Sequence, residues 1–194
     1  MNSMNKQLVN PFSDKKYITT DNTLREALSH CLKCSKITQN GKLIIPSTDL
    51  PSIILPKLVN NENKFFLIVN IKAEETGLIP GHWIGLSAYL GKGRVRGRCI
   101  AIDAANRLYK YGDTVSLIQR FCFNNKLNFI SYSCTFESPR SFICGQLILF
   151  MCYKTSLLSF NGMMNLKNII KYHTIPFNER YMLTQTIKHF KLKI

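Results

Sequence analysis

The sequence predicts an α+β fold in which a central, mostly antiparallel sheet is flanked by helices. Apolar, strand-like runs are concentrated in the middle of the chain, helix-like patterns lie before and after them, and short turns join the middle strands. The chain has 194 residues, enough for one well-buried core and too few for two ordinary domains. We therefore expect a single domain over residues 1–194.

The N-terminal third predicts one helix followed by a loop. Residues 1–20 are polar, and we expect them to be loosely ordered. The pattern of residues 23–41 predicts a helix with Asp21 or Asn22 as its cap. Residues 46–56 contain three prolines, which predicts a loop that follows the surface.

The middle of the chain predicts three strands of a meander. Residues 65–69 form a continuous apolar run, which is typical of a buried strand. Residues 82–90 and 99–103 predict the next two strands, and a glycine-containing turn over 91–97 joins them.

The C-terminal part predicts three helices and one strand. Residues 114–124 have helical spacing, and residues 127–136 alternate as a strand does. Two further helices are predicted over 141–158 and 178–191.

The composition is that of a globular and strongly basic protein. Hydrophobic residues make up 45% of the chain and charged residues 19%, which excludes a disordered chain. The net charge of +15 favours a polyanionic partner such as nucleic acid, although it also serves solubility. No secretory leader opens the sequence, and its longest apolar run, 147–153, is too short to span a bilayer. We expect a soluble, intracellular protein that does not bind membranes.

The cysteines predict free thiols. There are seven, an odd number without a repeat, which indicates a reducing compartment and not a disulfide framework. Cys31 and Cys34 form a lone C-x-x-C motif, and we expect both on one helix. No second pair lies at zinc spacing and only His30 is near in sequence, so a structural metal site is poorly supported and no metal is expected.

Cys144 is the candidate nucleophile. It lies at the start of the most apolar helix-like run, where unpaired backbone N–H groups favour a thiolate and can donate to an oxyanion. The alternative is a buried cysteine with a packing role. Upstream, His82 and Asp103 lie at the ends of strand-like segments, so a base and an orienting carboxylate are available. Together the three residues predict a cysteine hydrolase.

The other two candidates also have structural interpretations. His82 can be a core histidine whose ring nitrogens have hydrogen-bond partners, and Asp103 can cap a turn. Two other histidines are rivals for the role of base. His173 lies in a segment without a clear helix or strand pattern, and His189 lies in a lysine-rich helix, where a solvated role is expected.

Four cations occupy the turn between the strands that carry His82 and Asp103. Such a loop contacts phosphates without reading sequence, so DNA binding there is expected to weaken steeply with added salt. An exposed hairpin kept soluble by its charge explains the same residues. The candidates are Lys92, Arg94, Arg96 and Arg98, and Lys188, Lys191 and Lys193 would extend the same patch.

Several short motifs follow one another in a fixed order from about Lys64 to the C-terminus. They are Ile68-Val69-Asn70, Glu75-Thr76-Gly77, His82-Trp83, Asp103, Glu137-x-Pro139-x-Ser141-x-x-Cys144-Gly145 and Met164-Asn165-Leu166. In this order they resemble the adenovirus proteinase family, the adenain type of cysteine peptidase. The earlier residues match only as a helix followed by a proline-containing loop.

The resemblance implies an adenain-like fold and a role for each site residue. Cys144 is then the nucleophile, His82 the general base and later the acid, and Asp103 the partner of the histidine. The family's oxyanion hole combines the backbone N–H of the nucleophile with a glutamine seven residues earlier, where this chain has Glu137. An ionised Glu137 would repel an oxyanion. Either burial keeps Glu137 protonated, or another group donates in its place, or the activity is reduced or absent.

The resemblance also implies a substrate and a location. The enzyme would cleave precursor structural proteins of a DNA virus during virion maturation, in the virion and the host nucleus. It would cut after small residues, in a narrow cleft lined by Trp83. DNA would stimulate it, as would a short peptide that adds to the sheet.

Several points stay open at this stage. In the family a disulfide tethers the activating peptide to an enzyme cysteine, whose place falls near Lys126, whereas Cys122 and Cys134 lie at other spacings. We expect a monomer. One alternative function is a protease that removes ubiquitin-like modifiers, because that branch shares the His-Trp, Asp and Cys-Gly pattern. The other is a catalytically weakened DNA-binding protein that has kept the protease fold.

Overall fold

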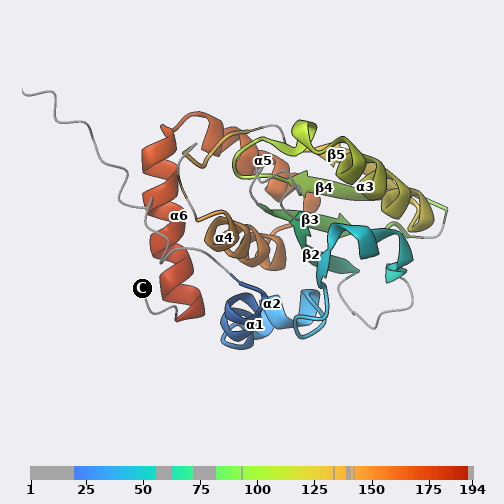
Figure 1. The fold of residues 1–194 in the computed structure, drawn as a ribbon, viewed down its shortest axis with the longest axis horizontal. Helices are drawn as coiled ribbons and strands as arrows, with labels where there is room; N and C mark the ends of the chain where they lie inside the picture. The colour runs from blue at the N-terminus through green and yellow to red at the C-terminus, as the bar shows by residue number, and fades with distance from the viewer. Residues whose placement is uncertain are drawn as a thin grey trace, which may run out of the picture.

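The computed structural model of the chain has one five-stranded sheet between two layers of helices (Figure 1). The predicted α+β class is therefore confirmed. Among the described residues, no helix has the length and apolar character needed to cross a lipid bilayer. The structure describes residues 20–55, 63–71, 82–92, 94–132, 134–138, 141 and 143–191.

The sheet is antiparallel at its centre and parallel at both edges. Its strands, in spatial order, are β1 (Ile44–Pro46), β2 (Lys64–Ile71), β3 (His82–Tyr89), β4 (Gly97–Ile102) and β5 (Leu127–Ser131). The three central strands form the predicted antiparallel meander, whereas β1 runs parallel to β2 and β5 runs parallel to β4. A parallel pair needs a crossover, and helix α3 (Gly112–Asn124) lies in the connection from β4 to β5. The sheet is thus mixed, and the antiparallel expectation holds only at its centre.

Helices cover both faces of the sheet. On one face α4 (Cys144–Leu157) packs directly on the strands. Its neighbours are α1 (Asp21–Ser29), α2 (Leu32–Ile37), α5 (Phe160–Lys171) and α6 (Ile175–Phe190) (Figure 1). The other face is covered by α3 and by the 3-10 turns η2 (Ser47–Ser52) and η4 (Leu108–Lys110).

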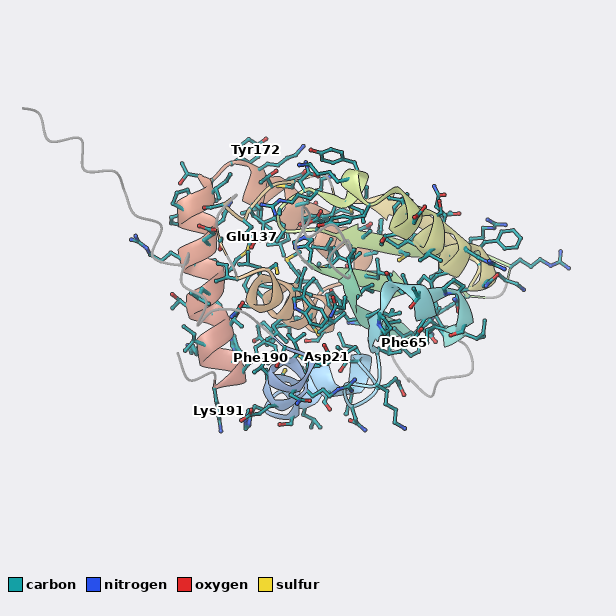
Figure 2. All side chains as sticks on the ribbon, in the orientation of Figure 1. Asp21, Phe65, Glu137, Tyr172, Phe190 and Lys191 are labelled. Carbon is teal, nitrogen blue, oxygen red and sulfur yellow. The ribbon has the colours of Figure 1, made fainter. Side chains whose placement is uncertain are left out.

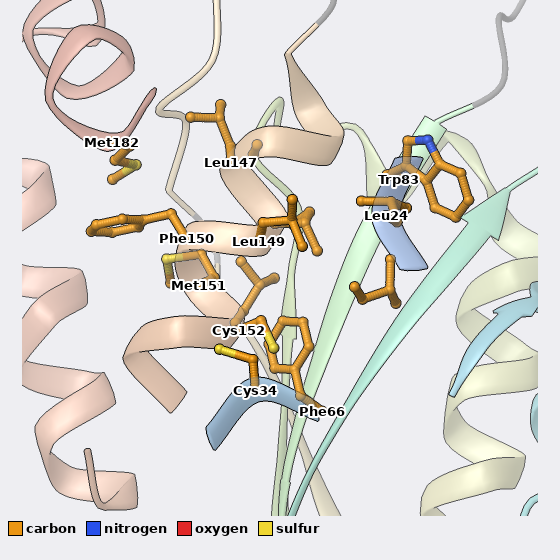
Figure 3. Close-up of a cluster of buried hydrophobic side chains, with 14 of the residues drawn as sticks. Leu24, Cys34, Phe66, Trp83, Leu147, Leu149, Phe150, Met151, Cys152 and Met182 are labelled. Atoms are coloured by element: carbon orange, nitrogen blue, oxygen red, sulfur yellow. The ribbon is translucent and has the colours of Figure 1, made fainter. Parts of the chain in front are cut away.

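Strand β2 contributes to both halves of the core. Successive strand residues point to opposite faces, so Phe66 and Ile68 lie on the α4 side while Phe65 and Leu67 lie on the α3 side. This explains the uninterrupted apolar run in the sequence. Figure 3 shows the α4 side, where Phe66 lies near two cysteine side chains from α2 and α4.

Helix α4 is enclosed, which explains why it is apolar on all sides and not along one stripe. Two polar contacts fix its position. Ser87 Oγ of β3 lies 3.0 Å from Thr155 Oγ1, and the Thr186 hydroxyl of α6 donates to the Gln146 carbonyl at 3.1 Å. These contacts hold the first residue of α4, the candidate nucleophile, over one end of the sheet.

The helix predicted over 23–41 is in fact two helices. The chain leaves helical geometry at Cys31, whose φ of −125° and ψ of 94° are extended, and α2 begins at the next residue. Neither glycine nor proline marks this break. The loop predicted over 46–56 contains the end of β1 and the turn η2.

The cap of the first helix also differs from the prediction. Thr20, and not Asp21 or Asn22, is the N-cap, and it forms a capping box with Thr23. Residues 1–19, which are expected to be loosely ordered, lie outside the described residues.

The strand predicted over 127–136 ends at Ser131. The side chains at 132, 134 and 136 are buried, but this segment leaves the sheet. The backbone N–H groups of Phe136 and Glu137 instead donate to the carbonyl of Ala104 at 2.9 and 3.0 Å. This bend brings Glu137 beside the loop that follows β4.

The C-terminal helices differ from their predicted bounds. The helix expected over 141–158 begins at Cys144, and α6 begins at Ile175, before the expected 178. The sequence pattern does not predict α5 at all. Its buried residues, Met163 and Ile170, pack into the core on the α4 side.

Candidate active site

Residues from separate segments come together at one end of the sheet. His82 is the first residue of β3, Asp103 directly follows β4, and Cys144 is the first residue of α4. His82 Nε2 lies 2.6 Å from Asp103 Oδ1. The Cys144 sulfur, a ring nitrogen of His82 and a carboxylate oxygen of Glu137 all lie within 4.8 Å of one another. The structure thus gathers the three candidate catalytic residues and Glu137 into one cluster.

The loop after β4 fixes Asp103, and Asp103 in turn orients the histidine ring. Asp103 Oδ1 accepts the backbone N–H of Ala105 at 3.0 Å, and Oδ2 accepts that of Arg107. The His82 ring stacks on Tyr111, with centroids 6.4 Å apart. Burial alone would raise the pKa of Asp103, but His82 and the two N–H groups outweigh it, so this pKa lies below its usual value. Asp103 is therefore a carboxylate at neutral pH.

Cys144 is a neutral thiol in the resting site, contrary to the thiolate expected at a helix start. Burial, followed by the charge of Glu137, raises the pKa of the Cys144 thiol to about 12. The backbone N–H groups of Trp83 and Gly145 lower it, but by less. The helix N-terminus acts in the predicted direction and is outweighed by its surroundings. The nucleophile must therefore lose its proton to a neighbouring base during the reaction.

Glu137 is a buried acid next to the nucleophile. It is 3% exposed, and its Oε2 atom has no hydrogen-bond partner among the described residues. Burial raises the pKa of Glu137 to about 8; Arg107 opposes this shift, whereas Asp103 and Glu179 add to it. The backbone N–H of Cys144 also lowers this pKa, so the carboxyl lies beside that N–H group. At neutral pH Glu137 is mostly a carboxylic acid, which can donate a hydrogen bond.

Helix α6 supports the segment that carries Glu137. Both carboxylate oxygens of Glu179 accept from Ser138, one from its backbone N–H at 2.6 Å and one from its hydroxyl at 2.7 Å. Glu179 is 2% exposed. Figure 2 places Glu137 between α6 and α4. The sequence analysis misses Glu179, because a single acidic residue within a helix pattern carries no signal of a contact 41 positions away.

The Trp83 ring packs in the core, and the Trp83 backbone N–H contacts the Cys144 thiol. The residue is 6% exposed, and its side chain belongs to the core on the α4 side (Figure 3). Its backbone N–H lowers the pKa of the neighbouring Cys144 thiol. The narrow cleft expected beside Trp83 stays a prediction.

The two rival histidines lie elsewhere. His173 lies in the turn between α5 and α6 and stacks on Phe177, with centroids 4.7 Å apart. His189 lies in the last turn of α6 and stacks on Tyr153 at 3.9 Å. Both rings are held by aromatic contacts on the outer helices, and the cluster around Cys144 contains His82.

The basic candidates lie at the opposite end of β3 and β4 from the catalytic cluster. Strand β3 runs from His82 to Tyr89, a span of about 23 Å at the usual rise per strand residue, and Tyr89 pairs with Arg98. The Arg98 guanidinium lies 4.3 Å from the centre of the Phe160 ring. All four candidates are exposed: Lys92, Arg94, Arg96 and Arg98. Lys188 and Lys191 are also exposed, and Lys193 lies outside the described residues.

The seven cysteines are all described and all free. Cys31, at the N-cap of α2, donates to Cys34 with the two sulfurs 2.6 Å apart, and Cys34 also contacts Cys152 of α4. Cys122 and Cys134, the cysteines nearest to the expected tether position, are 2% and 6% exposed. A disulfide to an external peptide would require either side chain to leave the core.

No protein-family model matches the chain, and no curated protein matches it at a significant score.

Proposed function

We propose that this chain is a cysteine endopeptidase in which Cys144, His82 and Asp103 form the catalytic triad. One observation carries the proposal, although the residues come from three segments. The thiol at a helix start lies within 4.8 Å of a ring nitrogen of the imidazole, and the imidazole lies 2.6 Å from an ionised carboxylate. A nucleophile next to a base, with the base oriented by a third group, is the arrangement that activates such nucleophiles.

The chemistry follows from the positions of the protons. As the Cys144 sulfur attacks the carbonyl carbon of a peptide bond, its proton moves to His82, and Asp103 stabilises the imidazolium that forms. The imidazolium then protonates the departing amine, which leaves a thioester on Cys144. Water, deprotonated by His82, attacks the thioester, releases the acid product and restores the thiol.

Glu137 and the backbone N–H of Cys144 are proposed to stabilise the oxyanion of each tetrahedral intermediate. The carboxyl is proposed to donate in its protonated form, which the raised pKa favours at neutral pH. This role is supported by the carboxyl group, which has one oxygen within 4.8 Å of the Cys144 sulfur, and by its buried Oε2 atom, which has no partner among the described residues. A carboxylate in the same place would repel the intermediate.

The biological role is proposed from the ordered motifs. We infer an adenain-type peptidase that cleaves precursor structural proteins of a DNA virus after small residues during virion maturation, in the virion and host nucleus. The exposed hairpin of Lys92, Arg94, Arg96 and Arg98 is proposed to bind DNA nonspecifically. Strand β5 is an edge of the sheet, so an activating peptide of the chain's virus could pair there without a disulfide.

Two alternatives remain, each with an observation in its favour. A protease acting on ubiquitin-like modifiers would use the same triad, and cleavage of tagged modifier conjugates would identify it. A DNA-binding protein with weakened catalysis is favoured by the exposed basic hairpin and by an acid at the oxyanion position. Such a protein would bind DNA and leave every peptide substrate intact.

The proposal is tested with fluorogenic peptides that place glycine or alanine before the scissile bond. We expect cleavage by the intact chain and none by Cys144→Ala. The matched control is Cys31→Ala, which removes another partly exposed thiol and should retain activity. Cleavage by Cys144→Ala at the level of the control would contradict the proposal, as would a folded chain that cleaves neither peptides nor a coexpressed capsid precursor.

A further inference from the structure

We infer that Cys144, His82 and Glu137 form a Zn²⁺ site, and that an ion held there reversibly blocks the proposed peptidase. The metal site follows from the geometry of the three side chains alone. Only the inhibition rests on the proposed function.

The three donor atoms are close enough to share one ion. They are a thiol sulfur, an imidazole nitrogen and a carboxylate oxygen, all within 4.8 Å of one another. In a tetrahedral zinc site with ligands at 2.0–2.3 Å, donor atoms lie roughly 3.3–3.8 Å apart. Side-chain movements of about 1 Å would therefore close the site. Sulfur, nitrogen and oxygen donors together favour zinc over magnesium or calcium, which take oxygen ligands.

Asp103 already supplies the outer contact that zinc-bound histidines use. It holds His82 Nε2 at 2.6 Å, which leaves Nδ1 as the ring nitrogen available to a metal. Metal-ligating histidines usually donate their other N–H group to a carboxylate, which fixes the orientation of the ring. The same contact that prepares His82 as a base therefore prepares it as a ligand.

Glu137 is the observation that separates this cluster from an ordinary cysteine–histidine pair. Its Oε2 atom is buried and has no hydrogen-bond partner among the described residues, although buried polar atoms are nearly always paired. A cation between Glu137 and the Cys144 sulfur would give this oxygen a partner. It would also compensate the negative charge that Asp103 and Glu179 place nearby.

Zinc at this position and catalysis exclude each other. When zinc binds, the Cys144 thiol and the Glu137 carboxylic acid each release a proton to the buffer, and the sulfur lone pair is no longer free to attack a carbonyl. His82 at the same time loses the nitrogen that would accept the proton. Three protein ligands leave a fourth position for water, and a chelator would restore the resting enzyme.

The test is titration of the full chain with Zn²⁺ by calorimetry, and with Co²⁺ followed by its sulfur-to-metal absorption band. Because Cys31 and Cys34 form a thiol pair that offers zinc other ligands, the reference protein carries Cys31→Ser and Cys34→Ser. We expect one ion per reference chain and a thiolate–cobalt band. Adding Glu137→Gln should weaken zinc binding by at least about tenfold, and adding Cys144→Ser should abolish the cobalt band.

The outcomes separate this inference from the proposed function. Zinc binding that is lost in the Cys31→Ser, Cys34→Ser reference, or is unchanged by Glu137→Gln in a folded variant, would overturn the site. Peptide cleavage that continues with one zinc bound would overturn the inhibition. A chain that binds zinc through these residues but cleaves no peptide would support the metal site and contradict the peptidase.

Discussion

The two ends of strands β3 and β4 are built in opposite ways. At one end His82 and Asp103 are buried at 5% and 4% exposure, and each depends on its neighbours for orientation or charge. At the other end the hairpin carries single exposed cations, of which Arg98 rests on an aromatic ring. The same two strands thus carry a coupled cluster and a set of independent charges.

This difference determines what a substitution does at each end. Charges in a buried site interact strongly, so replacing one group changes the pKa and the geometry of the others. Exposed charges are screened by salt, and each contributes a small and nearly additive amount. We therefore expect large, pH-dependent effects at the catalytic end and small, salt-dependent effects at the hairpin.

Apart from removal of the nucleophile, the largest effect is expected for Asp103→Asn. The amide keeps the size of the side chain but no longer stabilises an imidazolium, so kcat for peptide cleavage should fall by roughly 10⁴-fold. Asp113→Asn, at an exposed acid in the first turn of α3, is the matched control and should leave kcat unchanged. A loss of less than tenfold in a folded Asp103→Asn variant would mean that Asp103 only caps its turn.

The next effect is expected for Glu137→Gln, and its size should depend on pH. Because the pKa of Glu137 is raised to about 8, wild-type enzyme keeps the proton donor below this pH and loses it as the pH rises through 8. The amide donates at every pH. The variant should match wild type within a few-fold at pH 6 and exceed it by roughly tenfold at pH 9 and roughly 100-fold at pH 10, because about a tenth and a hundredth of Glu137 stay protonated there.

The control for that experiment is Glu26→Gln, at an exposed glutamate of α1. Its pH profile should follow wild type. Parallel profiles for wild type and Glu137→Gln across pH 6–10 would show that Glu137 takes no part in oxyanion binding.

A smaller effect is expected for Glu179→Ala. This change leaves the Ser138 N–H and hydroxyl without their buried acceptor, which should lower the free energy of unfolding by roughly 1.5–3 kcal/mol. It should also lower kcat roughly tenfold or more, with little change in KM, because the adjacent Glu137 is no longer held in place. Arg180→Ala, at the exposed next position, is the control. Lost stability without a change in kcat would limit Glu179 to a structural role.

The smallest effect is expected at the hairpin. Replacing Arg94 and Arg96 by glutamine should reduce the slope of log K for DNA against log salt by about 2, because each phosphate contact contributes about 0.9. Peptide cleavage without DNA should not change. Arg120→Gln on α3 is the control for loss of an exposed charge elsewhere. An unchanged salt slope in the double variant would contradict DNA binding by the hairpin, and its charges would then serve solubility.

Local sequence patterns predicted the strands that surround the site better than the connections. Strands β2, β3 and β4 agree with the run predicted at 65–69 and with the strands predicted before and after the hairpin. Burial of one or both faces of a strand requires apolar residues at regular positions, which the sequence shows directly. The alternation at 127–136 was misleading. The alternating pattern reflects the burial of side chains, which continues after Ser131, whereas strand β5 ends at that residue.

The elements that depend on distant contacts could not be predicted. Helix α5 contains glycine and asparagines and is held by the core contacts of Met163 and Ile170. Similarly, the helix-start rule favoured a thiolate at Cys144, but the raised pKa of that thiol arises from burial and from Glu137. The spatial gathering of the site residues is no more than a hypothesis from sequence alone, because spacing along a chain does not fix distances.

The central claim is that Cys144 is activated by His82, and one measurement tests it most directly. The chain is incubated with a peptide vinyl sulfone, and the modified cysteine is identified by mass spectrometry in wild type and in His82→Ala. We expect one adduct, on Cys144, whose rate of formation falls at least 100-fold in the variant, a loss in the range typical of a general base. Equal rates in the two proteins, or an adduct mainly on the partly exposed Cys31, would contradict the account.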